Sequence, residues 1–536
     1  MERDYLRTCV HPSGRFIAGV HRPSYEVRNN RLSTHRIALG KTTDGKVVRN
    51  DANFPEGDLQ IEAADWVYEV PNAFPMWGVT YILGRGAEKN GQDGLKFSFE
   101  PKGQTHFSGI PGLEKIDLAM LPRPILLAIA QTCTNDSLLE RLLPLCVGLE
   151  YDNKEERWVI RFHKDKDGNL VPEIKDHDLY ETLGNNPFLT DELKRLLLLN
   201  PGIQGSNPIV GEYIHKGKTH IWEYLRANSY IPWGHFAANM AQDSIRYSVD
   251  ELDMEDIKGL RHLYYQRIYC KLAANLNIKL GGKGFFSPNE LEDIRLSILQ
   301  RLDSIRQKGS TPFFTGTLWG WNYGYDFSPS GFRLHASHQQ IHQQFALIPG
   351  QAEALFEGKE QSPFFSYAIG DNISHFIHHY EKRHGTSFFE AYIQAIKNNT
   401  RLDGEKYLPR DLIITGDEDV ILFVPKAQRS QGEIQIITLR PCGNILEAGQ
   451  DIRQSLDSHI LVAVKILSRL GAKMITCFEM SKRFNHTSDQ RLMYCFLPKH
   501  PRSPGAFSEQ QGRWITGHFP EDYAQCCRDV LEEIQI

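Results

Sequence analysis

The sequence predicts an α+β protein in which one arrangement of strands and helices occurs twice, after an N-terminal region of unknown fold. Three observations support this prediction. Apolar residues recur at helical spacing from Val249 to Leu276, and a second helical pattern runs from Pro288 to Arg306 after the N-cap Ser287. Short apolar runs typical of strands flank these helices. A similar order of segments returns in the C-terminal third, which indicates a divergent duplication.

Residues 1–205 are predicted to form an N-terminal region whose role the sequence does not reveal. A strand-like run covers Trp158 to Phe162, and a helical pattern covers Leu193 to Leu199. Proline, glycine and asparagine then crowd the segment from Asn200 to Pro208, which is typical of a boundary between domains.

The first copy of the unit is predicted to span residues 206–350 and the second copy residues 406–536, with a helical connector at 351–405. In the first copy, a strand from Phe313 to Trp321 and a final strand ending at Pro349 follow the two helices. The second copy contains four apolar runs that we expect to be strands and one helical pattern. These segments are Val420 to Pro425, Gly432 to Ile437, the helical Ile452 to Leu470, Met474 to Met480, and Arg491 to Pro498.

Composition excludes several classes of protein. The 536 residues include 61 Lys and Arg against 66 Asp and Glu, a balance that argues against nucleic-acid binding and against a polybasic membrane anchor. The charged N-terminal residues do not resemble a signal peptide, and the apolar runs are too interrupted to span a bilayer. Nine cysteines, an odd number without a C-x-x-C pair, favour reduced thiols and a cytoplasmic location.

The most informative segment surrounds His342. If this segment is a strand, Ile341 and Phe345 point to the core, while Gln340, His342 and Gln344 share the opposite face. A neutral imidazole flanked by amides can attack phosphorus or act as a general base, and the amides can donate hydrogen bonds to phosphoryl oxygens. The pattern therefore indicates phosphorus chemistry.

This segment resembles a known active-site signature. The order from Ser337 to Gln344 is similar to S-N-P-H-P-H-G-Q of the galactose-1-phosphate uridylyltransferases, a branch of the histidine triad (HIT) superfamily that also includes diadenosine polyphosphate phosphorylases. Ser337, His342 and Gln344 fall in register with it. Further similarities occur at Asn228, Pro232, Gly234 and His235, at Asn322 and Gly324, and from Pro498 to Glu521. The resemblance covers about residues 206 to 536 and implies two HIT-like repeats, each an antiparallel sheet with helices.

The resemblance implies a role for each matched residue. His342 would be the nucleophile that takes a nucleoside monophosphate from a donor, and Gln344 would hold a non-bridging phosphoryl oxygen. Ser337 would contact the departing or incoming phosphate. The backbone carbonyl of Gln340 would accept the Nδ1 proton of His342, which leaves Nε2 free to attack. The other residues expected to contact the substrate are Asn228, Asn322, Arg333, Lys426 and Arg502.

Three departures from the family pattern affect the interpretation. Gln340 replaces the first histidine and the zinc-binding cysteines are absent, so no structural zinc is expected. HIT hydrolases carry a third histidine where this chain has Gln344, and an amide cannot protonate a leaving group, so transfer to a phosphate is favoured over hydrolysis. In the second copy Arg491 and Met493 replace His342 and Gln344, which predicts a repeat without activity.

The leading hypothesis is a nucleotidyltransferase or phosphorylase that acts on a nucleotide sugar or a dinucleoside polyphosphate through a nucleotidyl-histidine. Its partners would be a nucleotide donor and a phosphate-containing acceptor, and the resemblance implies a homodimer. One alternative is a non-catalytic nucleotide-binding protein on the same fold. Another is a metal-dependent hydrolase in which a divalent metal binds the cluster from His375 to His384. No other cofactor is indicated, and the sequence does not identify the base, the sugar or the acceptor.

Overall fold

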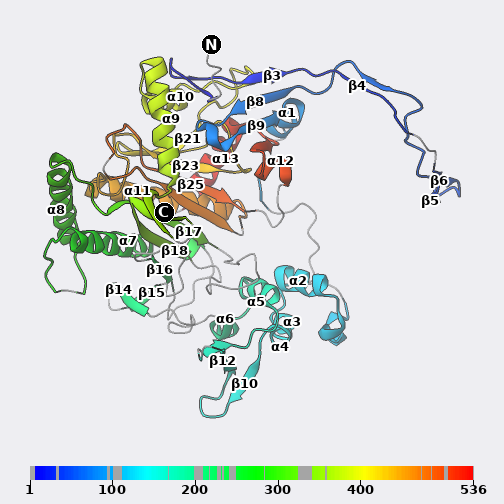
Figure 1. The fold of residues 1–536 in the computed structure, drawn as a ribbon. Coiled ribbons are helices and arrows are strands. Elements are labelled where there is room, and N and C mark those ends of the chain that lie inside the picture. The colour runs from blue at the N-terminus through cyan, green and yellow to red at the C-terminus, as the bar shows by residue number, and fades with distance from the viewer. Residues whose placement is uncertain are drawn as a thin grey trace.

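The protein is an α+β structure built around one large mixed arrangement of helices and antiparallel strands (Figure 1). The computed structural model describes most of the chain. The described residues are 7–31, 35–92, 97–99, 111–166, 168, 170–197, 209–215, 218–225, 231, 235–240, 249–282, 284–323, 341–356, 359–472, 474–484, 486–499 and 505–534.

A ten-stranded sheet joins the middle and the C-terminal third of the chain. Its neighbouring strands are all antiparallel. The strands in spatial order are β14 (Ile209–His215), β15 (Lys218–Leu225), β16 (His235–Met240), β18 (Ile341–Pro349), β17 (Phe314–Tyr323), β24 (Ile475–Met480), β25 (Met493–Pro498), β23 (Ile434–Thr438), β22 (Val420–Phe423) and β21 (Ile413–Gly416).

The two halves of this sheet have the same order of strands. In each half, two strands form a hairpin and a third strand follows, and a fourth strand comes after two α-helices in the first half and one in the second. The fifth strand then inserts between the third and the fourth. The halves meet where the two fourth strands, β17 and β24, pair antiparallel, with Gly320 opposite Phe478.

Helices cover one face of the sheet in both halves. They are α7 (Met254–Asn275) and α8 (Pro288–Gln307) in the first half and α11 (Gln450–Arg469) and α13 (Pro520–Glu533) in the second. Capping boxes start α7 at Asp253 and α8 at Ser287, and they satisfy backbone N–H groups that a first helical turn leaves free. Buried residues of α7, α8, α11 and α13 and of the sheet form one continuous hydrophobic core.

The opposite face of the second half is covered by helices of the connector and by N-terminal segments. α9 (Ile369–His384) and α10 (Phe388–Lys397) follow a hairpin of β19 (Gln351–Phe356) and β20 (Lys359–Phe365). Their apolar residues pack with Phe423, Met493 and Cys495 of the sheet in a second core. The predicted helical connector thus contains two helices, and a hairpin that the sequence did not indicate precedes them.

The N-terminal residues join the C-terminal segment in a four-stranded sheet. Its order is β26 (Arg513–Thr516), β9 (Val79–Leu83), β8 (Val67–Pro71) and β3 (Gly19–His21), and β26 runs parallel to β9. Gly78 has a φ of 79°, and a Cβ there would lie 2.0 Å from the carbonyl oxygen of Gly512. Only glycine therefore allows these two chain segments to approach so closely.

Residues 111–197 form a separate core of their own, seen around α2 to α6 in Figure 1. The expected helix from Leu193 to Leu199 corresponds to α6, and the expected strand from Trp158 to Phe162 is divided between β11 and β12. The elements are α2 (Arg123–Thr132), α3 (Asp136–Glu140), α4 (Leu143–Cys146), α5 (His177–Gly184), α6 (Asp191–Leu197), β10 (Leu149–Asp152), β11 (Arg157–Ile160), β12 (Phe162–Lys164) and β13 (Leu170–Pro172).

The remaining elements are short. They are β1 (Val10–His11), β2 (Arg15–Phe16), β4 (Tyr25–Val27), β5 (Ala38–Lys41), β6 (Val47–Arg49), β7 (Leu59–Ile61), α1 (Gly84–Gln92) and α12 (Ala506–Glu509). In the part of the chain that the structure describes, no helix has the length and apolar character needed to cross a bilayer. All nine cysteines are free thiols.

Candidate active site

His342 lies near the start of β18, between β16 and β17 in the ten-stranded sheet. Its backbone pairs with Asn239 of β16 on one side and with Asn322 of β17 on the other. Residues directly opposite each other in a sheet point to the same face. Three polar side chains from three strands therefore form one row across the sheet.

Side chains on β18 alternate between the two faces. Ile341, Phe345 and Leu347 belong to the core beneath the helices. Because side chains alternate along a strand, His342 and Gln344 point to the opposite face. The alternation that the sequence predicts for Ile341, His342, Gln344 and Phe345 is present in the structure.

The two ring nitrogens of His342 have different partners. Nδ1 contacts the side-chain oxygen Oδ1 of Asn239 and lies 3.2 Å from the hydroxyl of Tyr224. Nε2 lies 2.9 Å from the amide nitrogen Nε2 of Gln344. An amide oxygen only accepts and an amide nitrogen only donates, so the arrangement holds the neutral tautomer with its proton on Nδ1 and its lone pair on Nε2.

Aromatic rings support the imidazole from one side. The ring of Tyr224 lies nearly parallel to that of His342, with 6.3 Å between centroids and 21° between planes, and Trp222 packs against Tyr224 at 5.0 Å. The imidazole is fully buried. These contacts restrict rotation of the ring, so its nitrogens keep a fixed direction.

Gln344 has small neighbours on the adjacent strands. Its backbone pairs with Ala237 of β16 and with Gly320 of β17. These residues have the two smallest side chains, so neither cross-strand neighbour fixes the amide in place. The side chain can change rotamer without a clash against these two positions.

Most of the other residues expected at the site fall on parts of the chain that are not described. Gln340, Ser337, Asn228, Arg333 and Arg502 all lie outside the described residues. The expected contact between Nδ1 of His342 and the carbonyl of Gln340 therefore lies outside the described residues, and the described partners of Nδ1 are the side chains of Asn239 and Tyr224.

Lys426 does not belong to this site. Its ammonium group is buried, contacts the carboxylate of Glu521, and donates to Oδ1 of Asn399 at 2.9 Å and to the carbonyl of Thr400 at 2.8 Å. A buried ammonium with three acceptors has no free donor for a substrate phosphate. The expectation of a phosphate contact at Lys426 is corrected to a structural ion pair, because Glu521, distant in sequence, neutralises it.

In the second half, the strand that corresponds to β18 has apolar and structural side chains in place of the polar residues around His342. Met493 and Cys495 of β25 are buried in the apolar core under α9 and α10. Arg491, aligned with His342 in the sequence comparison, donates to the carbonyl of Leu439 at 2.8 Å and pairs with Asp489 at 3.1 Å. Among the described residues, this half presents no imidazole at the equivalent strand.

Sequence reasoning missed Asn239 and Tyr224. Asn239 follows the apolar residues Phe236 to Ala238, and alternation along the strand places it on the same face as His235. Tyr224 lies before Asn228, the first residue of the motifs that match the family pattern. Only strand pairing brings these two side chains to the imidazole, because they lie 103 and 118 residues away in sequence.

The histidines of α9 form a pair rather than a metal centre. Nε2 of His375 lies 3.0 Å from Nε2 of His379, and both side chains are exposed. Among the described residues, no group of three or more His, Cys, Asp or Glu side chains could hold a metal ion. A catalytic zinc takes three protein ligands, so the described pair does not favour the metal-dependent hydrolase.

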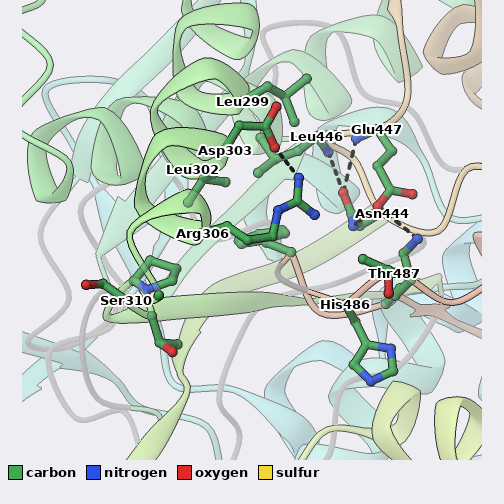
Figure 2. A pocket seen from close by; sticks show the side chains of 15 residues that line it. Leu299, Leu302, Asp303, Arg306, Ser310, Asn444, Leu446, Glu447, His486 and Thr487 are labelled. Atoms are coloured by element: carbon green, nitrogen blue, oxygen red, sulfur yellow. Dashed lines mark hydrogen bonds and ion pairs between the residues drawn. The ribbon is translucent and has the colours of Figure 1, made fainter.

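A separate pocket of about 450 Å³ lies near the opposite end of β17 from Asn322. Figure 2 shows the C-terminal part of α8 on one side and the segment with Asn444 and Glu447 on another. Arg306 pairs with Asp303, and Lys482 pairs with Glu447 at 2.9 Å. Since both cations already have carboxylate partners, the charge of this pocket does not favour an anionic ligand.

Comparison with known proteins gives matches only among solved structures. No protein-family model matches the sequence, and no curated protein matches it. The similar structures include a galt-like protein, uridylyltransferase structures and an ADP-glucose phosphorylase. A galt-like protein from Arabidopsis thaliana is 12% identical, with 61% of this chain and 89% of that chain covered and a TM-score of 0.37.

An ADP-glucose phosphorylase from Arabidopsis thaliana, solved with bound ADP-glucose, is 13% identical. The match covers 71% of this chain and 97% of that chain, with a TM-score of 0.37. A uridylyltransferase structure is 11% identical over 58% of this chain and 81% of that chain, with a TM-score of 0.36.

Proposed function

We propose that the protein is a nucleotidyltransferase or phosphorylase that acts on a nucleotide sugar or a dinucleoside polyphosphate. The observation that carries the proposal is the pair of partners on His342. Asn239 accepts at Nδ1, so the lone pair is on Nε2, where the amide nitrogen of Gln344 donates at 2.9 Å. A ring held in this tautomer is prepared for nucleophilic attack.

In the first step, the Nε2 lone pair of His342 attacks the α-phosphorus of the donor. An N–P bond forms, the bond from phosphorus to the bridging oxygen breaks, and the sugar phosphate or nucleotide leaves with that electron pair. The proton stays on Nδ1. The amide oxygen of Asn239 accepts a hydrogen bond from this N–H group and so stabilises the positive charge of the nucleotidyl-imidazolium. In the second step a phosphate oxygen of the acceptor attacks phosphorus, and the N–P electrons return to Nε2.

Gln344 has two positions in this scheme. Its amide covers Nε2 in the structure, so it must move aside before phosphorus can approach. The small neighbours Ala237 and Gly320 permit that movement. The same N–H group can then donate to a non-bridging oxygen, which gains negative charge in the transition state. Since an amide cannot donate a proton to a leaving group, acceptors with an ionised phosphate are favoured over water.

We infer that the two halves of the sheet are HIT-like repeats and that only the first is catalytic. The shared order of five strands supports the duplication. The apolar core around Met493 and Cys495 supports loss of activity in the second repeat, because it fills the face on which His342 lies in the first. The free thiols support a reducing compartment such as the cytoplasm.

The test is intact-protein mass spectrometry after brief incubation with UDP-, GDP- and ADP-sugars and with dinucleoside polyphosphates. We expect a mass increase of one nucleoside monophosphate in the wild-type protein and none in His342→Asn. His262→Asn is the matched control, because His262 is also buried in the first half but lies on α7, in the helix layer. An adduct that persists in His342→Asn would contradict the proposed nucleophile.

A second candidate is a nucleotide-binding protein without turnover. The complete burial of the imidazole favours it, because a substrate phosphorus must reach Nε2. Equilibrium binding of the same nucleotides distinguishes the two. Binding without any adduct or turnover in the wild-type protein would support the binding protein and reject the transferase.

A further inference from the structure

A row of residues on the face of His342 continues across the sheet into the second half. Directly opposite residues of neighbouring strands point to the same face. The residues that follow His342 in this row are Asn322 of β17, Thr476 of β24 and Leu497 of β25. All three are partly exposed, as is Gln344 beside the imidazole. This face is therefore open to solvent on both sides of the junction between β17 and β24.

Lys499 lies on the same face, directly after the end of β25. Its backbone N–H donates to the carbonyl of Met474 at 2.8 Å, so the pairing of β24 with β25 continues to this residue. Side chains alternate along a strand, so Lys499 shares the face of Leu497, two residues earlier. Its side chain is exposed. We call Asn322, Thr476, Leu497 and Lys499 the seam strip, because they cross the junction of the two halves.

No described side chain occupies the polar groups of the seam strip. Among the described residues, the side chains of Asn322, Thr476 and Lys499 have no hydrogen-bond or ion-pair partner. An amide, a hydroxyl and an ammonium all donate hydrogen bonds, and the ammonium also carries a positive charge. Phosphate oxygens accept from each of these groups. The strip therefore presents donors at increasing distance from His342 that match a chain of phosphates.

The surroundings of the Lys499 ammonium leave its charge incompletely compensated. Partial desolvation lowers the pKa of Lys499 and the charge of Arg429 lowers it further, while Glu509 and Glu433 oppose this decrease. Glu433 is already paired with Arg429. An additional anion beside the ammonium would favour its charged form. The position of Lys499 is therefore suited to a negatively charged group of a ligand.

The direction of attack leads toward this strip. Nδ1 of His342 contacts Asn239 of β16, so Nε2, at the other edge of the ring, is turned away from β16. In an in-line displacement the leaving oxygen lies on the far side of phosphorus from the attacking atom. The leaving group therefore extends away from β16, over β17 and β24. Gly320 leaves room there, because the only described atom within 4 Å of a Cβ built at this glycine is the carbonyl oxygen of Cys477 at 3.2 Å.

We propose that the donor is a dinucleoside polyphosphate and that Lys499 binds a phosphate of its leaving nucleotide. The proposal rests on the proposed function and names its substrate class. Neighbouring strands are about 4.8 Å apart, so Lys499 on β25 lies about 14 Å across the sheet from His342 on β18, and its side chain spans only part of that distance. The leaving group of a nucleotide sugar has one phosphate, joined to the α-phosphate through one oxygen, and then a neutral sugar. A leaving nucleoside polyphosphate, which keeps the electron pair of the broken P–O bond, carries negative charge farther along the strip.

The test measures equilibrium binding, which does not depend on the chemical step. Isothermal titration calorimetry compares diadenosine tetraphosphate with ADP-glucose, and the uridine and guanosine pairs in the same way, in full-length protein that carries His342→Asn to prevent turnover. We expect Lys499→Gln to raise the dissociation constant of the dinucleoside tetraphosphate at least about tenfold, and that of the nucleotide sugar less than about twofold, because only the first loses a hydrogen bond between charged groups.

Lys308→Gln is the matched control, because Lys308 is also exposed but follows α8 on the helix-covered face. It should leave both dissociation constants unchanged, and Lys499→Arg, which keeps the charge, should retain most of the binding. The proposal is overturned if Lys499→Gln weakens both ligands equally, only the nucleotide sugar, or neither, or if the parent protein does not bind the tetraphosphate. Binding as expected without any nucleotidyl-histidine adduct in the wild-type protein would instead reject the transferase and support the phosphate contact of Lys499.

Discussion

At the scale of single residues, the candidate site depends on two amides that contact different nitrogens of one imidazole. Asn239 determines which nitrogen of His342 carries the proton, and Gln344 occupies the nitrogen that would attack. Neither amide titrates near neutral pH, so the amide oxygen of Asn239 stays an acceptor and the amide nitrogen of Gln344 stays a donor. The chemistry expected at this site therefore follows from which atoms donate and which accept.

We expect Gln344→Ala to keep the nucleophile and to lose stabilisation of the phosphoryl oxygen. Turnover should fall about 100-fold, the usual effect of removing one hydrogen-bond donor to a developing negative charge. The mass adduct should still form on longer incubation. Steady-state kinetics of nucleotide release measures this effect. Gln344→Glu should be slower still, because its carboxylate repels the phosphate, and a rate within threefold of wild type in Gln344→Ala would contradict the assignment.

At the scale of elements, buried polar side chains hold the C-terminal helix on the rest of the protein. His518 lies between β26 and α13, next to Phe97 at 4.9 Å and Tyr523 at 5.4 Å between ring centroids. Burial lowers the pKa of His518 to about 4. Its imidazole is therefore neutral in the folded protein at neutral pH.

This pKa predicts a loss of stability in acid. Between pH 6.5 and about 4 the unfolded chain binds a proton at His518 that the folded chain does not, so the free energy of unfolding falls as pH decreases. By thermodynamic linkage, this proton uptake lowers the free energy of unfolding by about 3 kcal/mol in total once the pH has fallen to about 4. Urea denaturation at pH 7 and at pH 4.5 measures most of this decrease in the free energy of unfolding. His518→Asn should show a correspondingly smaller dependence on pH, and an unchanged dependence would argue against this histidine as the cause.

At the scale of the whole molecule, one arginine ties the two halves of the sheet together. Arg261 of α7 donates to Asp457 of α11 at 2.8 Å and to the hydroxyl of Tyr494 on β25 at 2.8 Å. The same hydroxyl contacts Glu479 of β24 at 2.6 Å. Burial raises the pKa of both Asp457 and Glu479, and the arginine charge opposes that increase.

We expect Arg261→Met to destabilise both halves together. It leaves two buried carboxyl groups without their cation, which costs about 3–5 kcal/mol when a buried pair is broken. Denaturant unfolding monitored by tryptophan fluorescence, with Trp319 beside the arginine, measures the change. Arg301→Met, at an exposed position of α8, is the control and should stay within about 0.5 kcal/mol of wild type. Equal stability of the two variants would contradict the role of Arg261.

The sequence by itself determined the main helices and the two faces of β18. Helix α8 begins at Pro288 as expected, because its cap is a local signal that needs no distant partner. The alternation of His342 and Gln344 with Ile341 and Phe345 is equally local, since side chains of a strand change face at each residue.

Only the tertiary structure decided which side chains meet. Asn239 and Tyr224 reach His342 through strand pairing, and Glu521 neutralises Lys426 from the far end of the chain. The pairing of β26 with β9, which needs the close approach of the chain at Gly78, likewise joins opposite ends of the sequence. Such contacts depend on the register of strands that are distant in sequence. A local pattern of residue types gives each strand its faces but not its neighbours.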